Sequence, residues 1–542
     1  MSLSSRKIFG DKYYLIVDDF AEMRAVLKTV LRSLGASYIE QASDGEEALI
    51  VMRKTRYDVV LCDYNLGSGK DGQQVLEEAR YRNLIGVDSI FIMVTAENTR
   101  EMVMGAVEYT PDSYLRKPVT KELLETRITK LFERKADLKP VSRALMNKDY
   151  ALAIDELDQL IATRPKNLHE LVKLKAQICL NSNRYDTALN IYEQALRSRE
   201  LPWAYLGKGQ VFYKQKKYQQ ALEVFQYLVI QERHLVTAYD WLAKTQMALK
   251  DFQGAEQTLA TAVQISPRAV KRQQQLGELA FNNNHTEVAE AAFQKAVQFS
   301  RNSILRHPAQ FAGLAKSKTA NDKHEEAEKI VRDMGRNFAN TPETQFYAAT
   351  ATAAIQYNQG DSEGVAESLH MADQLLHQMG ESSSPTLGLE LAKAHAQAGN
   401  QEKANQLLQT LIANNHDDDE FVNEILQFCS DVDGSDEMDQ KVRAVRQEVI
   451  RTNNNGVRLI QQGRYDDAIA LLRQAAENMT GNKTINLNAA KALIIKMEKT
   501  GPHPDDVQSV RRYVDRVAQL EPDDWRLSDI NNRLRKLTQQ LF

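Results

Sequence analysis

The sequence has little of the features that mark secreted or membrane proteins. Its 542 residues include only three cysteines, Cys62, Cys179 and Cys429, and none of them forms a CxxC pair. Such sparse, dispersed cysteines are typical of a reducing compartment. No apolar run approaches the roughly 18 residues that a membrane-spanning helix needs. Residues 1–12 also lack the apolar segment of a signal peptide. These absences predict a cytoplasmic protein that does not insert into a membrane.

Motifs for catalysis and a strong excess of charge are missing as well. We find no Walker loop, no metal-binding spacing of His, Cys and Glu, and no convincing Ser/His/Asp arrangement. The formal net charge is −4 and 26% of the residues are charged, which gives no reason to expect nucleic acid or an anionic membrane as a partner. The length exceeds that of one compact core. We therefore expect a multidomain protein that is not an enzyme.

Residues 13–135 alternate short apolar runs with amphipathic stretches. The runs predict five strands, at 13–17, 37–42, 58–62, 89–94 and 112–115. The amphipathic stretches predict five helices, at 21–34, 44–54, 72–82, 98–108 and 120–134. Five such β-then-α units predict an α/β doubly wound fold, in which a five-stranded parallel sheet has helices on both faces. Ligands bind such sheets beyond the carboxyl ends of the strands.

Carboxylates stand at two of these strand ends. Asp18 and Asp19 follow "YYLIV", and Asp63 follows "VVLC". The first and third strands are neighbours in a doubly wound sheet, so the three acids converge and would repel one another without a divalent cation. Mg²⁺ favours such oxygen ligands. One carboxylate could then attack a phosphoryl group, while Thr95 and Lys117, also at strand ends, offer it a hydroxyl and an ammonium group.

The segments "VDD", "CDYN", "VTAE" and "YLRKP" make residues 13–133 resemble the receiver domain of two-component response regulators, which has a flavodoxin-like fold. The resemblance implies that Asp63 is the phosphoacceptor. It also implies that Asp18, Asp19 and Asp63 bind Mg²⁺, together with the backbone carbonyl of Asn65. The phosphoryl donor would be a histidine kinase or a phosphotransfer protein.

The same resemblance gives roles to three further residues. Thr95 and Lys117 would contact the phosphate, and Thr95 and Tyr114 would form the switch pair. One departure is the loop "DYNLGSGKDG", which is one residue longer than the commonest form and lacks its Met-Pro. Structural readings stay open for single residues: Asp19 as the N-cap of the helix near Ala21, and Tyr114 as a plain aromatic of the sheet.

A repeat begins after about residue 136. An aromatic residue or threonine precedes an alanine by three positions in five successive units, and the alanines are 33 to 35 residues apart, at Ala153, Ala188, Ala221, Ala255 and Ala289. This pattern closely resembles the tetratricopeptide repeat (TPR), whose helix pairs stack into a solenoid. The resemblance implies an extended surface for a protein partner.

The repeat loosens farther along the chain. The stretch 416–440 holds many acids and no Lys or Arg, so we expect it to interrupt the stack as a solvated connection, or to dock onto the basic residues 441–451. The predicted domains are a tail at 1–12, the receiver at 13–135, a regular TPR array at 136–300, degenerate helix pairs at 301–415, the acidic connection at 416–440, and C-terminal repeats with a capping helix at 441–542.

These patterns predict a response regulator in which phosphorylation of Asp63 controls the binding of an unidentified protein to the TPR array. The last receiver helix leads through "RKADLKP" into the first repeat, so we expect coupling along that connection. Two alternatives stay open. The chain could be an RNA- or DNA-associated adaptor, against which the charge argues, or an accessory subunit that regulates a partner kinase or phosphatase. The sequence does not indicate an oligomeric state.

Overall fold

The structure is a computed structural model of the whole chain, and it describes residues 8–96, 111–380, 383–433, 436–522 and 524–539. The chain forms two compact units. The first comprises Met1–Leu249, Gln253–Leu276 and Gln294–His307, and the second comprises Lys250–Phe252, Gly277–Phe293 and Pro308–Phe542. Residues 13–135 thus share a unit with the first helix pairs. The domain limits predicted from the sequence stay predictions.

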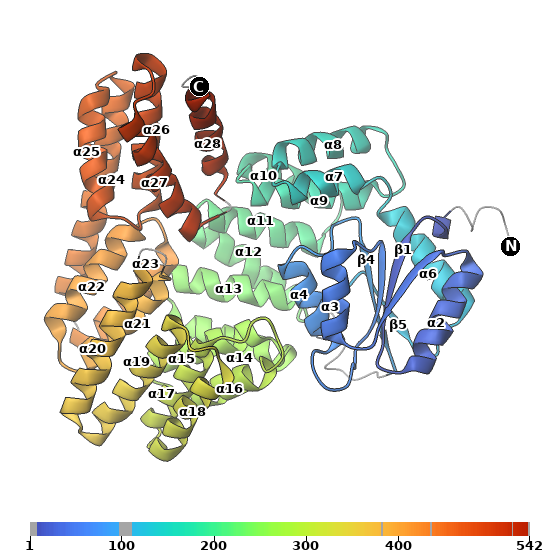
Figure 1. Cartoon of the computed structure of the whole chain (residues 1–542), viewed down its shortest axis with the longest axis horizontal. Coiled ribbons are helices and arrows are strands. Elements are labelled where there is room, and N and C mark those ends of the chain that lie inside the picture. Colours follow the sequence, from blue (N-terminus) through green and yellow to red (C-terminus); the bar gives the residue numbers. More distant parts are fainter. Residues whose placement is uncertain (1–7, 97–110, 381–382, 434–435, 523, 540–542) are drawn as a thin grey trace. The chain divides into compact units, whose positions relative to one another are not determined.

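The first unit begins with a five-stranded parallel sheet (Figure 1). Its strands are β1 (Tyr13–Val17), β2 (Tyr38–Ala42), β3 (Val59–Asp63), β4 (Ile90–Thr95) and β5 (Ser113–Arg116). Their order is β2-β1-β3-β4-β5, which confirms the predicted doubly wound fold. It also places the ends of β1 and β3 side by side.

Helices cover both faces of this sheet, as Figure 1 shows. On one face, α2 (Ala21–Leu34) and α6 (Lys121–Arg134) pack on alternate strand residues such as Ile16. On the other face, α3 (Gly45–Lys54) and α4 (Gly72–Tyr81) pack on the residues between, such as Leu15. This alternation follows from the period of two along a strand. The helix predicted at 98–108 lies outside the described residues.

After α6 every described element is a helix. In the predicted regular array, each aromatic residue or threonine of the repeat begins the second helix of a pair. The helices are α7 (Lys139–Met146), α8 (Tyr150–Ala162), α9 (Leu168–Asn181), α10 (Tyr185–Ser198), α11 (Pro202–Lys214), α12 (Tyr218–Gln231), α13 (Val236–Ala248), α14 (Phe252–Ile265), α15 (Val270–Asn282) and α16 (Thr286–Phe299).

Glycines allow close packing between successive helices of this array. A Cβ atom on Gly207 of α11 would lie 2.1 Å from the ring of Tyr192 on α10, and one on Gly209 would lie 2.5 Å from the ring of Phe225 on α12. Both rings are fully buried. Any side chain larger than hydrogen at these two positions would therefore force the helices apart.

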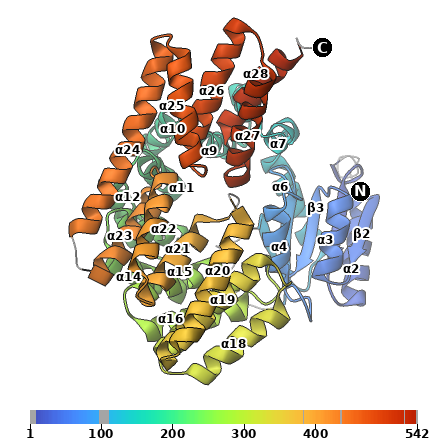
Figure 2. The ribbon, with the colours of Figure 1, turned by 60° about the vertical axis from the view of Figure 1, so that its left-hand side comes forward.

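The second unit continues with antiparallel helices, of which α19 and α20, and α25 and α26, run side by side (Figure 2). Its elements are α17 (Pro308–Ala320), α18 (His324–Asn337), α19 (Pro342–Gln359), α20 (Ser362–Met379), α21 (Pro385–Gln397), α22 (Gln401–Asn414), α23 (Asp419–Asp433), α24 (Asp436–Gln461), α25 (Tyr465–Asn478), α26 (Lys483–Thr500), α27 (Pro504–Leu520) and α28 (Trp525–Thr538). No helix of the described residues is long and apolar enough to cross a membrane.

The acidic stretch 416–440 differs from the solvated connection that the sequence predicted. Helix α23 fills most of it and buries Val422, Ile425 and Leu426 in the core cluster that also holds Leu408 of α22. These apolar residues recur at helical spacing, so an apolar face exists among the acids. The alternative interpretation gains support, because Asp419 forms an ion pair with Arg446 in the basic stretch 441–451.

Candidate functional site

Three carboxylates meet at the carboxyl end of the receiver sheet. Asp18 and Asp19 follow β1, and Asp63 is the last residue of β3. Their oxygen atoms lie within 4.8 Å of one another. Asp18 is 0% exposed and Asp63 is 6% exposed, whereas Asp19 is exposed to solvent. The convergence expected from the order of the strands is therefore present.

Lys117, directly after β5, joins two of these acids. Its Nζ donates a hydrogen bond of 2.8 Å to Oδ2 of Asp18 and one of 2.6 Å to Oδ2 of Asp63. The backbone N–H of Lys117 donates to the carbonyl of Thr95 at 2.8 Å, which ties the lysine to the end of β4. Burial would lower the pKa of Lys117, but the two carboxylates outweigh burial and raise it. The lysine therefore stays charged beside the acids.

Burial also acts on Asp63. It raises the pKa of this carboxyl group, although the ammonium of Lys117 and the backbone N–H of Asn65 oppose the effect. Asp18 adds to the rise because a like charge disfavours ionisation. Negative charge at Asp63 is thus costly in the site as it stands, and a bound cation would relieve that cost.

The donor set suits Mg²⁺. Three carboxylates supply hard oxygen ligands within reach of one ion, and exposed Asp19 leaves the cluster open to solvent for the waters that Mg²⁺ retains. Lys117 accounts for only one oxygen of Asp18 and one of Asp63. The carbonyl of Asn65 as a further ligand stays a prediction.

Thr95 and Tyr114 lie on adjacent strands. Thr95 ends β4 and is buried, and the residue before it, Val94, is the register partner of Asp63. Tyr114 pairs in register with Met93 and packs against the core between the sheet and helices α3 and α4. Burial raises the pKa of its hydroxyl. Their pairing as a switch stays a prediction.

The interpretation of Asp19 as an N-cap can be compared with this geometry. The N-cap of α2 is Phe20, and no side chain caps that helix, so Asp19 does not serve as its cap. Asp18 instead accepts a hydrogen bond of 3.0 Å from the N–H of Phe20. Cys62, beside Asp63, is fully buried in β3, and burial raises the pKa of its thiol.

Several contacts of the site were not predicted. Arg24 on α2 donates a hydrogen bond of 2.6 Å to the backbone carbonyl of Asp18, which fixes the chain after β1. Arg268, in the turn between α14 and α15, donates one of 2.8 Å to the hydroxyl of Tyr64, the residue after Asp63. Nothing in the local sequence singles out Arg268, since its partner lies 204 positions away.

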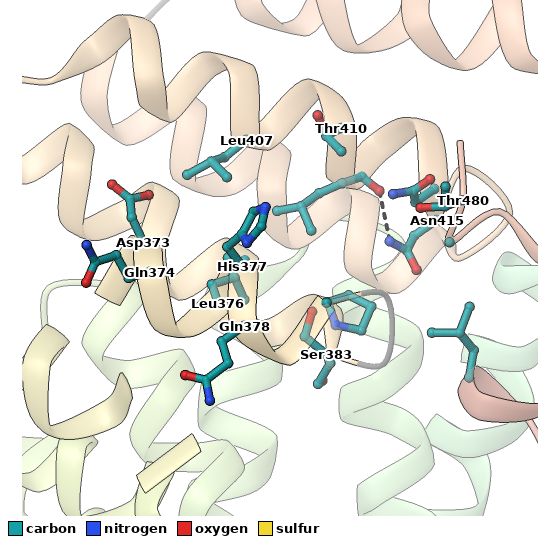
Figure 3. Close-up of a pocket in the computed structure, with 18 of the residues that line it drawn as sticks. Asp373, Gln374, Leu376, His377, Gln378, Ser383, Leu407, Thr410, Asn415 and Thr480 are labelled. Carbon is teal, nitrogen blue, oxygen red and sulfur yellow. Dashed lines mark hydrogen bonds between the residues drawn. The ribbon is translucent and has the colours of Figure 1, made fainter. Parts of the chain in front are cut away.

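The second unit contains a separate cavity of about 1000 Å³ between α20, α21, α22 and the chain around Thr480 (Figure 3). Asp373 and His377 of α20 line it together with Thr410 of α22. Burial would raise the pKa of Asp373, but a hydrogen bond with His395 lowers it. The lining offers charged, imidazole, amide, hydroxyl and apolar groups, and the sequence did not predict this cavity.

The chain is similar to known proteins in two regions. Residues 14–129 match the family model described as a response regulator receiver domain, and residues 174–234 match a model described as a tetratricopeptide repeat. Chemotaxis protein CheY-3 of Vibrio cholerae is 36% identical over 120 residues, which is 22% of this chain and 91% of that protein. Chemotaxis protein CheY of Pseudomonas aeruginosa is 35% identical over 120 residues, 22% of this chain and 95% of that protein.

Solved structures match the same region. The structure of chemotaxis response regulator CheY4 of Vibrio cholerae is 26% identical to this chain, and the match covers 22% of this chain and 98% of that one, with a TM-score of 0.21.

Proposed function

Because this chain belongs to the response regulators, with an N-terminal receiver domain followed by tetratricopeptide repeats, we propose that phosphorylation of Asp63 controls the binding of a protein partner to the repeats. The donor would be a histidine kinase or a phosphotransfer protein. The observation that carries the proposal is the convergence of Asp18, Asp19 and Asp63, of which Asp18 and Asp63 contact the ammonium of Lys117.

Each of these groups has a chemical role in the proposed transfer. A carboxylate oxygen of Asp63 attacks the phosphorus, so an O–P bond forms while the bond to the donor breaks and the donor keeps its electron pair. Lys117 already contacts Asp63, and its ammonium group can bind a phosphoryl oxygen once the phosphoryl group is attached there. Thr95, at the neighbouring strand end, offers a hydroxyl to another. Mg²⁺, when bound by Asp18, Asp19 and Asp63, would neutralise charge on the phosphoryl oxygens.

Intact mass or Phos-tag electrophoresis after incubation with acetyl phosphate and Mg²⁺ tests the assignment. We expect one phosphoryl group on the wild type and none on Asp63→Ala. Asp11→Ala, which removes an exposed acid just before β1, serves as the control and should be labelled like the wild type. Equal labelling of Asp63→Ala and the control would refute the assignment.

Asp19→Ala tests the metal separately. Without this carboxylate we expect most of the labelling and its dependence on Mg²⁺ to disappear, because the remaining acids hold the ion less well. The output is tested by affinity capture of partner proteins with and without beryllofluoride, a phosphoryl mimic. If the amount of captured partner changes neither with beryllofluoride nor in Asp63→Ala, control by phosphorylation is contradicted.

A further inference from the structure

Arg268 links the repeats to the chain beside Asp63. Its guanidinium group donates hydrogen bonds of 2.8 Å to the hydroxyl of Tyr64 and 3.2 Å to Oδ2 of Asp71. The same group lies 6.0 Å from the ring centroid of Tyr64 and 5.8 Å from that of Phe299, so it sits between an aromatic ring of the receiver and one of the repeats. Hydrogen bonding and cation–π contact together fix its position.

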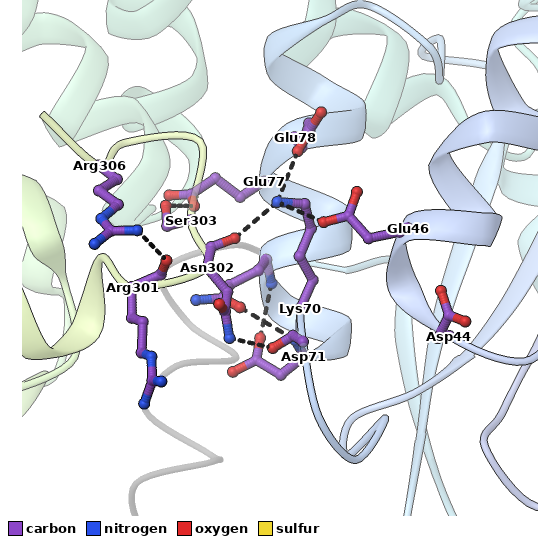
Figure 4. A network of polar contacts seen from close by, with 12 residues as sticks. Asp44, Glu46, Lys70, Asp71, Glu77, Glu78, Arg301, Asn302, Ser303 and Arg306 are labelled. Carbon is purple, nitrogen blue, oxygen red and sulfur yellow. Dashed lines mark hydrogen bonds and ion pairs between the residues drawn. The ribbon is translucent and has the colours of Figure 1, made fainter. Parts of the chain in front are cut away.

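A second set of contacts comes from the segment after α16. The side chain of Asn302 donates to the carbonyl of Gly69, and the Nζ of Lys70 donates to the carbonyl of Asn302 at 2.8 Å. The hydroxyl of Ser303 donates to Glu77 of α4 at 2.7 Å. Figure 4 shows Lys70 between Asn302 and the receiver's own acids. All of these residues belong to the first compact unit.

The chain that these contacts hold is attached to the phosphoacceptor itself. Tyr64 is its next residue, and the carbonyl of Tyr64 accepts a hydrogen bond of 2.8 Å from the N–H of Gly72. A Cβ atom on Gly72 would lie 2.1 Å from the carbonyl oxygen of Asp63, so the start of α4 rests directly on the phosphoacceptor's backbone. Asp71 caps α4 at that point. A restraint on Tyr64 and Asp71 is therefore a restraint on the backbone around Asp63.

We propose that Arg268 is a positioning residue of the phosphorylation site, contributed by the repeats. Together with Phe299, Asn302 and Ser303 it forms a clamp that holds residues 64–77 in their unphosphorylated arrangement. The inference rests on the proposed function, because it names how the repeats regulate that same site. The clamp slows phosphorylation of Asp63, and phosphorylation loosens the clamp.

The positions of the contacts explain why the clamp and phosphorylation oppose each other. A phosphoryl group on Asp63 carries about 1.5 to 2 negative charges where the carboxylate carried one, and it is larger than the carboxylate, so the loop that begins at Tyr64 must shift to accommodate it. Tyr64 and Gly69 are held at one side by the repeats, and this shift breaks or strains those contacts. Equilibrium coupling is reciprocal. If the clamp contacts disfavour the phosphoryl group on Asp63, then the phosphoryl group weakens the clamp contacts by the same free energy.

Hydrogen exchange and labelling of the full chain test the two halves of the inference. In Arg268→Ala, without Mg²⁺ or donor, we expect faster exchange in residues 64–77 and 299–303. With acetyl phosphate and Mg²⁺, we expect Asp63 to be labelled faster, by about fivefold when an equilibrium coupling at the lower end of the common range acts wholly on the rate of labelling. Arg268→Lys keeps the charge but not the paired hydrogen bonds, so its rate should lie between those of the wild type and Arg268→Ala.

Arg301→Ala is the matched control. It removes the same charge from an exposed side chain of the segment 299–303, and Figure 4 shows that Arg301 lies apart from the contacts of Lys70. Unchanged exchange in Arg268→Ala relative to this control would overturn the clamp. Faster exchange with an unchanged labelling rate would overturn its effect on Asp63. If the wild type takes up no phosphoryl group, the proposed function fails, whereas a labelled wild type with equal rates in both arginine variants overturns the inference alone.

Discussion

Replacing Lys117 by methionine would leave Asp18 and Asp63 without the cation they share. The side chains of Lys117, Asp18 and Asp63 are 13%, 1% and 7% exposed, so the two carboxylates would be buried without the ammonium group that neutralises them. Removing one partner of a buried pair typically costs about 3–5 kcal/mol. We expect the free energy of opening β1 and β3 to fall by about that amount. Since each 1.4 kcal/mol is a factor of ten, exchange of their backbone amides should accelerate by about 150- to 4000-fold.

The measurement is hydrogen exchange of the full chain near neutral pH without Mg²⁺. Lys139→Met is the control, because Lys139 approaches Asp58 at 3.5 Å but is 66% exposed. An exposed pair contributes at most about 1 kcal/mol. Mg²⁺ should restore more protection in Lys117→Met than in the wild type, since it would neutralise the same carboxylates. If Lys117→Met exchanges like Lys139→Met, the electrostatic account of this site is incorrect.

Three further predictions concern the helices. Gly207→Ala should cost about 1–3 kcal/mol, because the new methyl group meets the ring of Tyr192, whereas Gly335→Ala, with no atom within 4 Å, should leave the melting temperature unchanged or higher. Ile425→Asn should cost about 2–4 kcal/mol and expose 419–433 to proteases; a solvated connection would tolerate it. Burial would raise the pKa of Glu290, but hydrogen bonds from neighbouring side chains lower it to about 2. The stabilisation of the folded state by ionised Glu290 is thus complete above its ordinary pKa of 4.5 and lost as the pH falls through about 2. Acid should therefore reduce the helical circular dichroism signal less in Glu290→Gln than in the wild type. An equal loss of signal in both proteins would contradict this.

Local periodicity was sufficient to predict most of the fold. The apolar run before Asp63 forms a strand buried on both faces, which is why it reads as continuous rather than alternating. Tyr150 and Tyr185 begin helices α8 and α10, where the repeat placed them. The carboxylate cluster followed from the same reasoning, because the order of the strands fixes which strand ends meet. Each of these inferences needs only a short segment and its period.

Inferences failed where composition or distance concealed the signal. In 416–440 the density of acids suggested solvent, but Val422 and Ile425 lie three positions apart and supply an apolar face. No local sequence pattern distinguishes Arg268, because its contact with Tyr64 depends on how the α14–α15 turn packs against the receiver. The predicted coupling through 134–140 was drawn from chain connectivity alone and stays a prediction. Contacts between segments far apart in sequence require the packed structure.

The unusual loop after Asp63 gains a physical explanation from these contacts. Gly67 and Gly69 have φ values of 72° and 116°, a region that side chains disfavour, so the loop follows a path that depends on glycine. That path presents the carbonyl of Gly69 to Asn302 and brings Lys70 within 2.8 Å of the same residue. A loop with the commoner Met-Pro would restrict the backbone where this chain has glycines. The departure from the usual receiver sequence thus lies where the repeats contact the loop. This position is expected if the loop couples phosphorylation of Asp63 to the repeats.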